Sequence, residues 1–112
     1  MDIYYRPENH NVEIVGEIDY YEEPYEFDLT VVWRRKDDGK LLYADDSGCS
    51  CPTPFEDHRF EDGDFTVASA HQISEHIMRK VEEREKSVLS PGRDEQLRGR
   101  AAELIGRIMT GL

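Results

Sequence analysis

Long apolar runs are missing from this sequence of 112 residues, and positively charged residues are scarce. No stretch reaches the roughly 18 consecutive apolar residues that a membrane-spanning helix requires, so we expect no membrane partner. Lys and Arg number 14 against 25 Asp and Glu, which gives a formal net charge of −11 at pH 7. A surface with this balance repels nucleic-acid phosphates, and we therefore expect no direct binding of DNA or RNA.

Cysteine is also scarce, with only Cys49 and Cys51 in the chain. Secreted domains of this size that depend on disulfides normally carry more cysteines. The N-terminal residues 1–5 lack the basic and apolar regions of a signal peptide. These features predict a soluble protein that stays in a reducing cytoplasm.

Motifs that carry common enzyme chemistry are absent from the sequence. There is no glycine-rich phosphate loop, and no nucleophile-elbow pattern surrounds Ser47 or Ser50. His71 and His76 are five residues apart, so they do not share a helix face as a metal-binding pair at i, i+4 would. We expect both histidines at the surface or its boundary. The sequence thus favours a protein without catalytic residues over an enzyme.

What the sequence does contain is enough apolar material for one core. Apolar residues make up 38 % of the chain, and its length suits one domain, residues 1–112. The charge is uneven, because residues 1–68 hold 18 acidic and 6 basic groups while residues 69–112 hold 7 and 8. An acidic first part can keep the protein soluble, hold a cation or bind a basic protein, and these alternatives stay open.

Two segments of the first part alternate between apolar and polar residues, as half-buried strands do. Residues 12–18 place apolar or small side chains at even positions, and residues 25–34 place apolar side chains at odd positions up to Trp33. We expect Trp33 to anchor the core. Asp38-Gly39 predicts a type I′ turn, after which residues 40–45 return as a third strand.

The second part shows the periodicity of two amphipathic helices. Ser69 and Gln72 predict a capping box at the start of the first helix, and Ser90-Pro91 predicts the start of the second. The apolar stripes are Ala70, Ile73, Ile77, Val81 and Val88, and then Leu97, Ala101, Leu104, Ile105 and Ile108. The short connector predicts antiparallel packing.

Together these patterns predict an α+β fold. A three-stranded antiparallel meander is followed by a long polar loop over residues 46–66 and by an antiparallel helix pair packed on one face of the sheet. A loop of this length is uncommon in a compact domain and is often functional.

The last helix carries small residues on the side opposite its apolar stripe. Gly99, Ala102 and Gly106 fall within about 60° of one another on a helical wheel. Such a face lets another helix approach closely, which predicts a surface for a homodimer or another partner. The same glycines also weaken a helix by about 1 kcal/mol each, so a loosely formed C-terminal helix is the alternative.

The most unusual segment of the chain is Asp45–Asp57. It contains the tract Asp46-Ser47-Gly48-Cys49-Ser50-Cys51-Pro52, followed by Pro54-Phe55-Glu56. From Tyr43 to Glu56, about one eighth of the chain, the sequence resembles a family of small uncharacterised proteins encoded by bacteriophages of actinobacteria. The resemblance implies a phage origin and the cytoplasm of the infected bacterial host. It brings no activity, ligand or catalytic residue with it.

Three chemical interpretations of this tract stay open. Cys49 and Cys51 could bind zinc, and the residues that could complete the shell are Asp45, Asp46, His58 or Asp57. Zinc sites, however, usually separate their cysteines by about two to four residues, and here one intervenes. The two thiols could form a small, strained and easily reduced disulfide ring, but the acidic surroundings oppose the low thiol pKa of a redox relay. The third interpretation is a structural turn at residues 46–48 stiffened by the prolines. We therefore expect no cofactor, with zinc as the alternative.

The expected function is a non-enzymatic interaction with a host or phage protein. Electrostatics favours a basic partner, and a homodimer stays open. The candidate binding residues of the loop are Asp46, Ser47, Cys49, Ser50, Cys51 and Phe55. The alternative function is a metal- or thiol-dependent module that uses the Cys-Ser-Cys loop.

Overall fold

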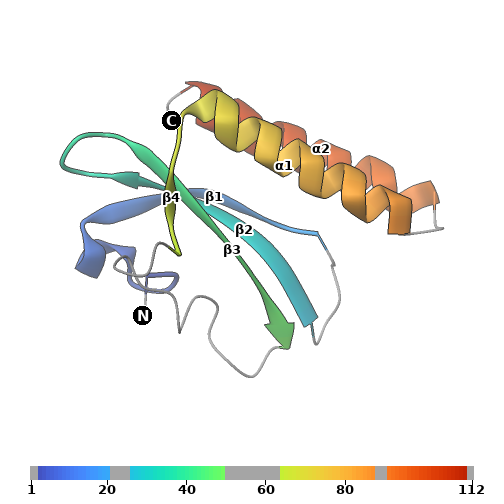
Figure 1. The fold of residues 1–112 in the computed structure, drawn as a ribbon, viewed down its shortest axis with the longest axis horizontal. Helices are drawn as coiled ribbons and strands as arrows, with labels where there is room; N and C mark the ends of the chain where they lie inside the picture. Colours follow the sequence, from blue (N-terminus) through green and yellow to red (C-terminus); the bar gives the residue numbers. More distant parts are fainter. Residues whose placement is uncertain (1–2, 21–25, 50–63, 88–90, 111–112) are drawn as a thin grey trace.

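The computed structural model describes residues 3–20, 26–49, 64–87 and 91–110 of the chain. Within these ranges a short 3-10 helix and four strands precede two α-helices (Figure 1). Their bounds are η1 Pro7–His10, β1 Val12–Asp19, β2 Glu26–Arg35, β3 Leu41–Cys49, β4 Thr66–Val67, α1 Ala70–Ser87 and α2 Pro91–Thr110. The fold is α+β, as predicted, with two helices packed on one antiparallel sheet.

The strands of the sheet follow chain order, β1-β2-β3-β4, and each neighbouring pair is antiparallel. The predicted three-stranded meander is right for β1 to β3 but omits β4. Strand β4 begins at Thr66, the last residue of the stretch 46–66 that the sequence assigns to a loop, and within the described ranges it pairs with Leu42 and Tyr43. Because a two-residue strand has no alternation of its own, periodicity could not reveal it.

Strand β3 is longer than predicted, since it runs to Cys49 rather than ending at Asp45. Residues 46–48 pair with residues 27–29 of β2. Asp, Ser and Gly are weak strand formers, but β2 supplies main-chain partners on one side, and the Ser47 N–H donates to Asp46 Oδ1. The first part of the distinctive tract therefore belongs to the sheet and not to a loop.

The β2–β3 hairpin has a longer turn than the two-residue type I′ turn predicted at Asp38-Gly39. Gly39 has a φ of 72°, whereas Asp38 does not have a positive φ. The Gly39 N–H donates to the Arg35 carbonyl and the Arg35 N–H donates to the Lys40 carbonyl, both at 2.9 Å. Only Gly39 adopts the left-handed conformation here, which glycine reaches without a Cβ clash.

Strand β1 contains a β-bulge at Val15 that changes which face its side chains occupy. The register with β2 shifts between Ile14 and Gly16. The extra residue moves the alternation by one position, so Val12 lies on the face away from the helices and Ile18 lies under them. The predicted alternation is correct as a strand signal and wrong in giving these side chains one shared face.

Each face of the sheet carries its own core. The helix-covered core contains Ile18, Tyr20, Val32, Ile73, Ile77, Val81, Leu97, Ala101, Leu104 and Ile108. The second core, on the opposite face, contains Ile3, Val12, Leu29, Val31, Trp33, Leu42 and Ala44. Trp33 is 0 % exposed and contacts the Phe65 ring edge-on at 5.5 Å between centroids. Trp33 thus anchors a core, as predicted, but not the one that the helices cover.

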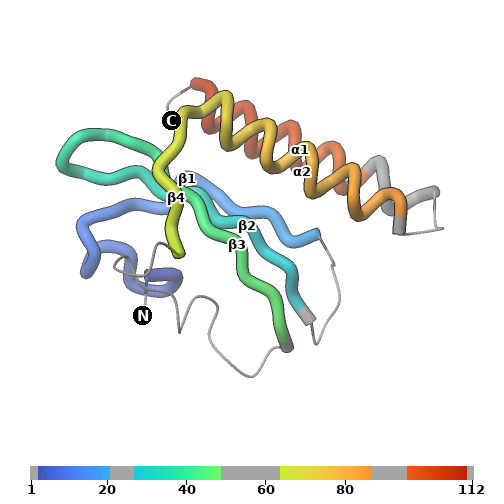
Figure 2. The backbone as a smooth tube through the Cα atoms, viewed as in Figure 1, coloured from blue at the N-terminus to red at the C-terminus, as the bar shows by residue number. Residues whose placement is uncertain are grey.

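Helices α1 and α2 lie side by side and run antiparallel over one face of the sheet (Figure 2). The predicted capping box is present, because the Ser69 N–H donates to Gln72 Oε1 at 3.0 Å and the Gln72 N–H donates to Ser69 Oγ at 3.1 Å. Arg98 of α2 donates two bonds of 2.7 Å to the Glu85 carboxylate of α1. These contacts fix where α1 begins and how the two helices align.

Candidate functional site

The sheet face beneath α1 carries polar side chains as well as apolar ones. Asp28 and Thr30 of β2 share this face with Val32, and Asp45 of β3 pairs with Thr30 in the register. The more apolar odd-numbered face of β2 packs into the second core instead. The helices therefore cover the more polar face of the strand, which brings carboxylates beneath α1.

A chain of hydrogen bonds crosses this face, and we call its members the polar cluster: Tyr20, Thr30, Asp45 and His76. The Tyr20 hydroxyl donates to Thr30 Oγ1 at 2.8 Å, and the Thr30 hydroxyl donates to Asp45 Oδ1. His76 Nε2 lies 2.7 Å from Asp45 Oδ2, and its ring packs on Tyr43 at 4.5 Å between centroids. The cluster joins β2 and β3 to the middle of α1.

A second link between the helix and the sheet lies one turn further along α1. Lys80 Nζ is 3.3 Å from Asp28 Oδ1, and it also lies 5.3 Å from the centroid of the Tyr20 ring. The side chains of Lys80 and Asp28 are 25 % and 17 % exposed, so solvent only partly screens this pair. His76 and Lys80 are four residues apart and thus face the sheet together.

The electrostatics of the cluster favour an ionised Asp45. Burial alone would raise the pKa of Asp45, but hydrogen bonds from His76 and Thr30, with the charges of His76 and Lys80, outweigh burial and lower the pKa. Burial raises the pKa of Tyr20, against the opposing effect of its bond to Thr30, so the phenol stays a proton donor. At neutral pH Asp45 is therefore a hydrogen-bond acceptor and Tyr20 a donor.

The bonds of the polar cluster run between protein groups, so the arrangement acts first as a clamp. Thr30 is 0 % exposed, and its hydroxyl both accepts from Tyr20 and donates to Asp45. Within the described ranges, no three His, Cys, Asp or Glu side chains gather closely enough to hold a metal ion. The cluster therefore supports positioning of α1 on the sheet.

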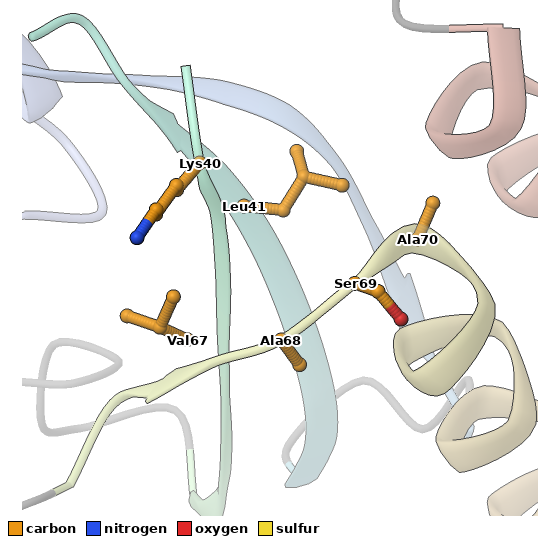
Figure 3. A pocket seen from close by; sticks show the side chains of 6 residues that line it. All are labelled: Lys40, Leu41, Val67, Ala68, Ser69 and Ala70. Carbon is orange, nitrogen blue, oxygen red and sulfur yellow. The ribbon is translucent and has the colours of Figure 1, made fainter. Parts of the chain in front are cut away.

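A hollow of about 420 Å³ lies where β4 leads into α1 (Figure 3). We call it the edge groove, and its lining residues are Lys40, Leu41, Val67, Ala68, Ser69 and Ala70. Figure 3 shows the Lys40 and Val67 side chains on the same side of the strands, with Ala70 in the first turn of α1. Val67 is 49 % exposed although it is apolar. This combination of a hollow and an exposed apolar side chain suits a protein contact better than a small polar ligand.

A second hollow, of about 350 Å³, lies near the opposite sheet edge and is lined by Glu13, Ile14, Val15, Arg34 and Arg107. Both guanidinium groups have carboxylate partners, since Arg34 lies 3.6 Å from Glu13 and Arg107 lies 3.0 Å from Glu103. This hollow is therefore a weak candidate for an anion site, because carboxylates already neutralise both of its arginines.

The candidate residues of the Cys-Ser-Cys tract fall only partly within the described ranges. Asp46 and Ser47 lie in β3, where Asp46 Oδ1 accepts the Ser47 N–H at 3.0 Å. Cys49 is the last residue of β3, and its side chain lies outside the described part. The other candidates that lie outside it are Ser50, Cys51, Phe55 and His58. The zinc and disulfide interpretations therefore stay predictions.

The small-residue face of α2 is solvent exposed, as the helical wheel predicts. Gly99, Ala102 and Gly106 are all exposed, and a Cβ added to either glycine would meet nothing within 4 Å. Met109, which is 56 % exposed, follows on the same helix. The structure places this face outward and leaves its role as an interface a prediction.

Sequence reasoning missed both the polar cluster and the edge groove. The sequence alone predicts His76 at the surface or its boundary and offers Asp45 only as a zinc ligand. One signal in the sequence could have located Asp45. It follows Leu41 and Tyr43 at alternate positions of the strand, so its side chain lies on the same face, which the helices cover. Nothing in the sequence links that position to His76, which lies 31 residues away.

No helix in the described part of the chain has both the length and the apolar character needed to cross a membrane. No curated protein and no solved structure matches the chain. Residues 1–103 match the model of a domain of unknown function, DUF7574. Because this match spans most of the 112 residues, the chain belongs to the DUF7574 family, in line with the uncharacterised family that its sequence predicts.

Proposed function

We propose that this protein works by binding another protein, and that the edge groove is the binding surface. The observation that carries the proposal is Val67, a half-exposed apolar side chain on the two-residue strand at the sheet edge. Edge strands present main-chain groups that another chain can pair with, and natural proteins usually protect them. Here the edge is short, apolar and bordered by a hollow.

The groove suits an extended segment that adds to the sheet. In this mode of recognition, main-chain hydrogen bonds supply affinity and an adjacent pocket accepts a side chain. The groove offers apolar atoms of Leu41, Val67 and Ala68 for such a side chain. Ala70 marks the far wall, where α1 begins.

The polar cluster supports this function by holding the wall of the groove in place. Helix α1 starts at Ala70, beside the groove, and its His76 and Lys80 are bound to Asp45 and Asp28 of the sheet. A wall fixed before binding loses less conformational entropy when the partner arrives. The cluster thus has a role in binding without any substrate of its own.

The sequence resemblance favours a phage-encoded protein that acts in the cytoplasm of the infected host, so a host or phage protein is the proposed partner. The net charge of −11 favours approach by a basic partner from a distance. At the groove itself Lys40 is the charged lining residue, so the contacting segment should not be strongly basic. The thiol- or metal-dependent module stays the alternative, based on Cys49 and Cys51.

The test is affinity capture with the full chain, from infected and uninfected host cells, with each captured protein identified and then reconstituted from pure components. We expect Val67→Lys to weaken the reconstituted complex by at least about tenfold. Ile14→Lys, a matched change at an exposed apolar residue on the opposite edge strand, should leave it unchanged. A complex that is unaffected by Val67→Lys but lost when Cys49 and Cys51 become Ser would overturn the groove and favour the thiol module.

A further inference from the structure

We infer that the occupant of the edge groove is a second copy of this chain, with strand β4 of each copy paired antiparallel about a twofold axis at Val67. The inference rests on the proposed function, because it names the partner of the same groove. The backbone of β4, the charge beside the groove and the opposite edge of the sheet support it.

The main chain of Val67 faces away from the sheet. The Ala68 N–H donates to the Leu41 carbonyl at 3.2 Å, so the main chain of Ala68 points toward β3. Because successive residues of a strand point their N–H and C=O groups to opposite sides, those of Val67 point outward. Val67 and Leu42 form a non-hydrogen-bonded pair of the antiparallel ladder. The N–H and C=O groups of Val67 can therefore pair with another strand.

A twofold axis at Val67 makes the pairing self-complementary. The N–H and C=O of Val67 in one copy then meet the C=O and N–H of Val67 in the other, giving two main-chain hydrogen bonds. The two half-exposed valine side chains come into contact across the axis, which removes both from water. A closed twofold contact also ends the sheet extension at two copies.

The same register brings opposite charges together. Asp64 of one copy falls opposite Ala70 of the other, where α1 begins. The first turn of α1 contains no acidic residue, so its N-terminal partial positive charge is not offset by a carboxylate of that turn. Lys40, which lines the groove, adds a full positive charge beside the same position.

The local charge also suits a contact between two copies of an acidic protein. The hairpin turn beside the groove, residues 35–40, contains three basic and two acidic residues, although the chain carries −11 in total. Two copies that meet at this edge therefore avoid most of the repulsion that other orientations would bring. A strongly basic partner would gain less here than elsewhere on the molecule.

The opposite edge of the sheet is protected against the same kind of pairing. Strand β1 is interrupted by the bulge at Val15 and carries Glu13 and Glu17, both exposed. Bulges and charged side chains are the features that keep natural edge strands from pairing with one another. Self-pairing is thus directed to β4.

The test is the mass of the untagged full chain in solution, measured by light scattering after size exclusion and by native mass spectrometry over a wide range of concentrations. We expect twice the 13.1 kDa chain mass for the wild type. Val67→Pro removes the N–H donor, and Val67→Lys places two like charges at the axis while keeping that donor. Both should weaken self-association by at least about tenfold, whereas Ile14→Lys should not.

A charge exchange tests the register. Lys40→Glu and Asp64→Lys should each weaken the dimer, and the two changes combined should restore it, because the pair is reversed across the axis. Circular dichroism of each variant establishes that it has folded, and Val67→Lys keeps the inference testable if Val67→Pro does not fold. Failure of the double variant to restore the dimer would overturn the proposed register.

A monomeric wild type at every concentration would overturn the inference. So would a dimer that survives Val67→Lys but is lost in a Gly99→Leu, Gly106→Leu double variant, since that result places the contact on α2. If the chain is monomeric and still binds another protein in a Val67-dependent manner, only this inference fails and the proposed function stands. If the dimer depends on Val67 but the capture of a different protein does not, the groove binds a second copy of the chain and the proposed binding of a different protein there fails.

Discussion

Asp45 connects three elements through one carboxylate. It lies on β3 and accepts bonds from Thr30 of β2 and His76 of α1. Asp45 is partly buried, and a carboxylate in such a position that loses a partner retains part of the cost of leaving water without the compensating bond. The stability of the helix-covered side should therefore depend strongly on these few residues.

Replacing His76 by Ala should lower the free energy of unfolding by about 1–3 kcal/mol, because it leaves one Asp45 oxygen without its donor. Urea denaturation measures the change. His71→Ala is the matched control, since the His71 side chain is 75 % exposed and its pair with Glu75 is solvated; we expect a change within about 0.5 kcal/mol. Equal effects of the two substitutions would contradict the clamp.

The lowered pKa of Asp45 sets a direction for the pH dependence of stability. A carboxyl group whose pKa is lower in the folded than in the unfolded protein stabilises the fold above its unfolded pKa, near 3.8, and this contribution is lost as pH falls through the folded pKa. We expect the difference in unfolding free energy between the wild type and Asp45→Asn to shrink in that acidic range. A difference that grows on acidification would show that the pKa is raised instead.

At the level of elements, the approach of α2 to β1 depends on Gly16. A Cβ built on Gly16 would lie 2.5 Å from Leu104 Cδ1, and Leu104 is buried in the helix-covered core. Leu104 has little room to move because protein cores are close-packed. The absence of a side chain at Gly16 therefore sets the distance between the last helix and the sheet.

Gly16→Ala should destabilise the protein by about 1–3 kcal/mol through overpacking. Gly106→Ala should have the opposite sign and stabilise by up to about 1 kcal/mol, because the added Cβ meets nothing and alanine favours a helix. Thermal or urea unfolding of both variants tests the pair. Gly16→Ala should cost less in a Leu104→Ala background than in the wild type, although Leu104→Ala itself destabilises the core; an equal cost in both backgrounds would show that the clash with Leu104 is not the cause.

The helices and strands show which features could be predicted from the sequence alone. The capping box at Ser69, the start of α2 at Pro91 and the helix stripes could be predicted, because each depends on residues within a few positions of one another. Val88, the last residue of the first predicted stripe, lies outside the described ranges. The strand alternation of β1 and β2 could also be predicted. The sequence could not predict which face of the sheet the helices cover. Strand β2 has Val32 on its more polar face and Trp33 on its more apolar face, and both side chains are fully buried.

The candidate sites were harder to predict than the elements. The polar cluster depends on the pairing of β3 with β2 and on helix α1 lying above them, so its members are up to 56 residues apart in the chain. The edge groove depends on β4, whose two residues carry no period. The exposed small-residue face of α2 was visible in the sequence because it lies within one helix.

At the scale of the whole molecule, β2 is shared by two cores. Val32 packs beneath the helices, while Leu29, Val31 and Trp33 pack on the other side. A strand buried on both faces cannot be exposed on one side without weakening the other. We therefore expect the two cores to unfold together.

Trp33, the only tryptophan, reports the core away from the helices, whereas far-ultraviolet circular dichroism reports mainly α1 and α2. The two signals should follow one urea transition with the same midpoint. If helical signal disappears before the Trp33 emission changes, the cores are separable. The experiment needs no substitution and can be run on the wild type.

The bulge at Val15 has a genetic consequence. Because it moves the alternation of β1 by one position, the strand supplies Val12 to one core and Ile18 to the other. Deletion of the Val15 codon would remove the extra residue and keep both halves in register, with Val12 still aligned with Arg35 and Ile18 with Thr30. A one-residue insertion into the second half of the strand would instead place Glu17 where Ile18 now lies. Loss of Val15 should thus be inherited more readily than an insertion into β1, so members of this family should keep the present spacing between the residues equivalent to Val12 and Ile18 or a spacing shorter by one residue.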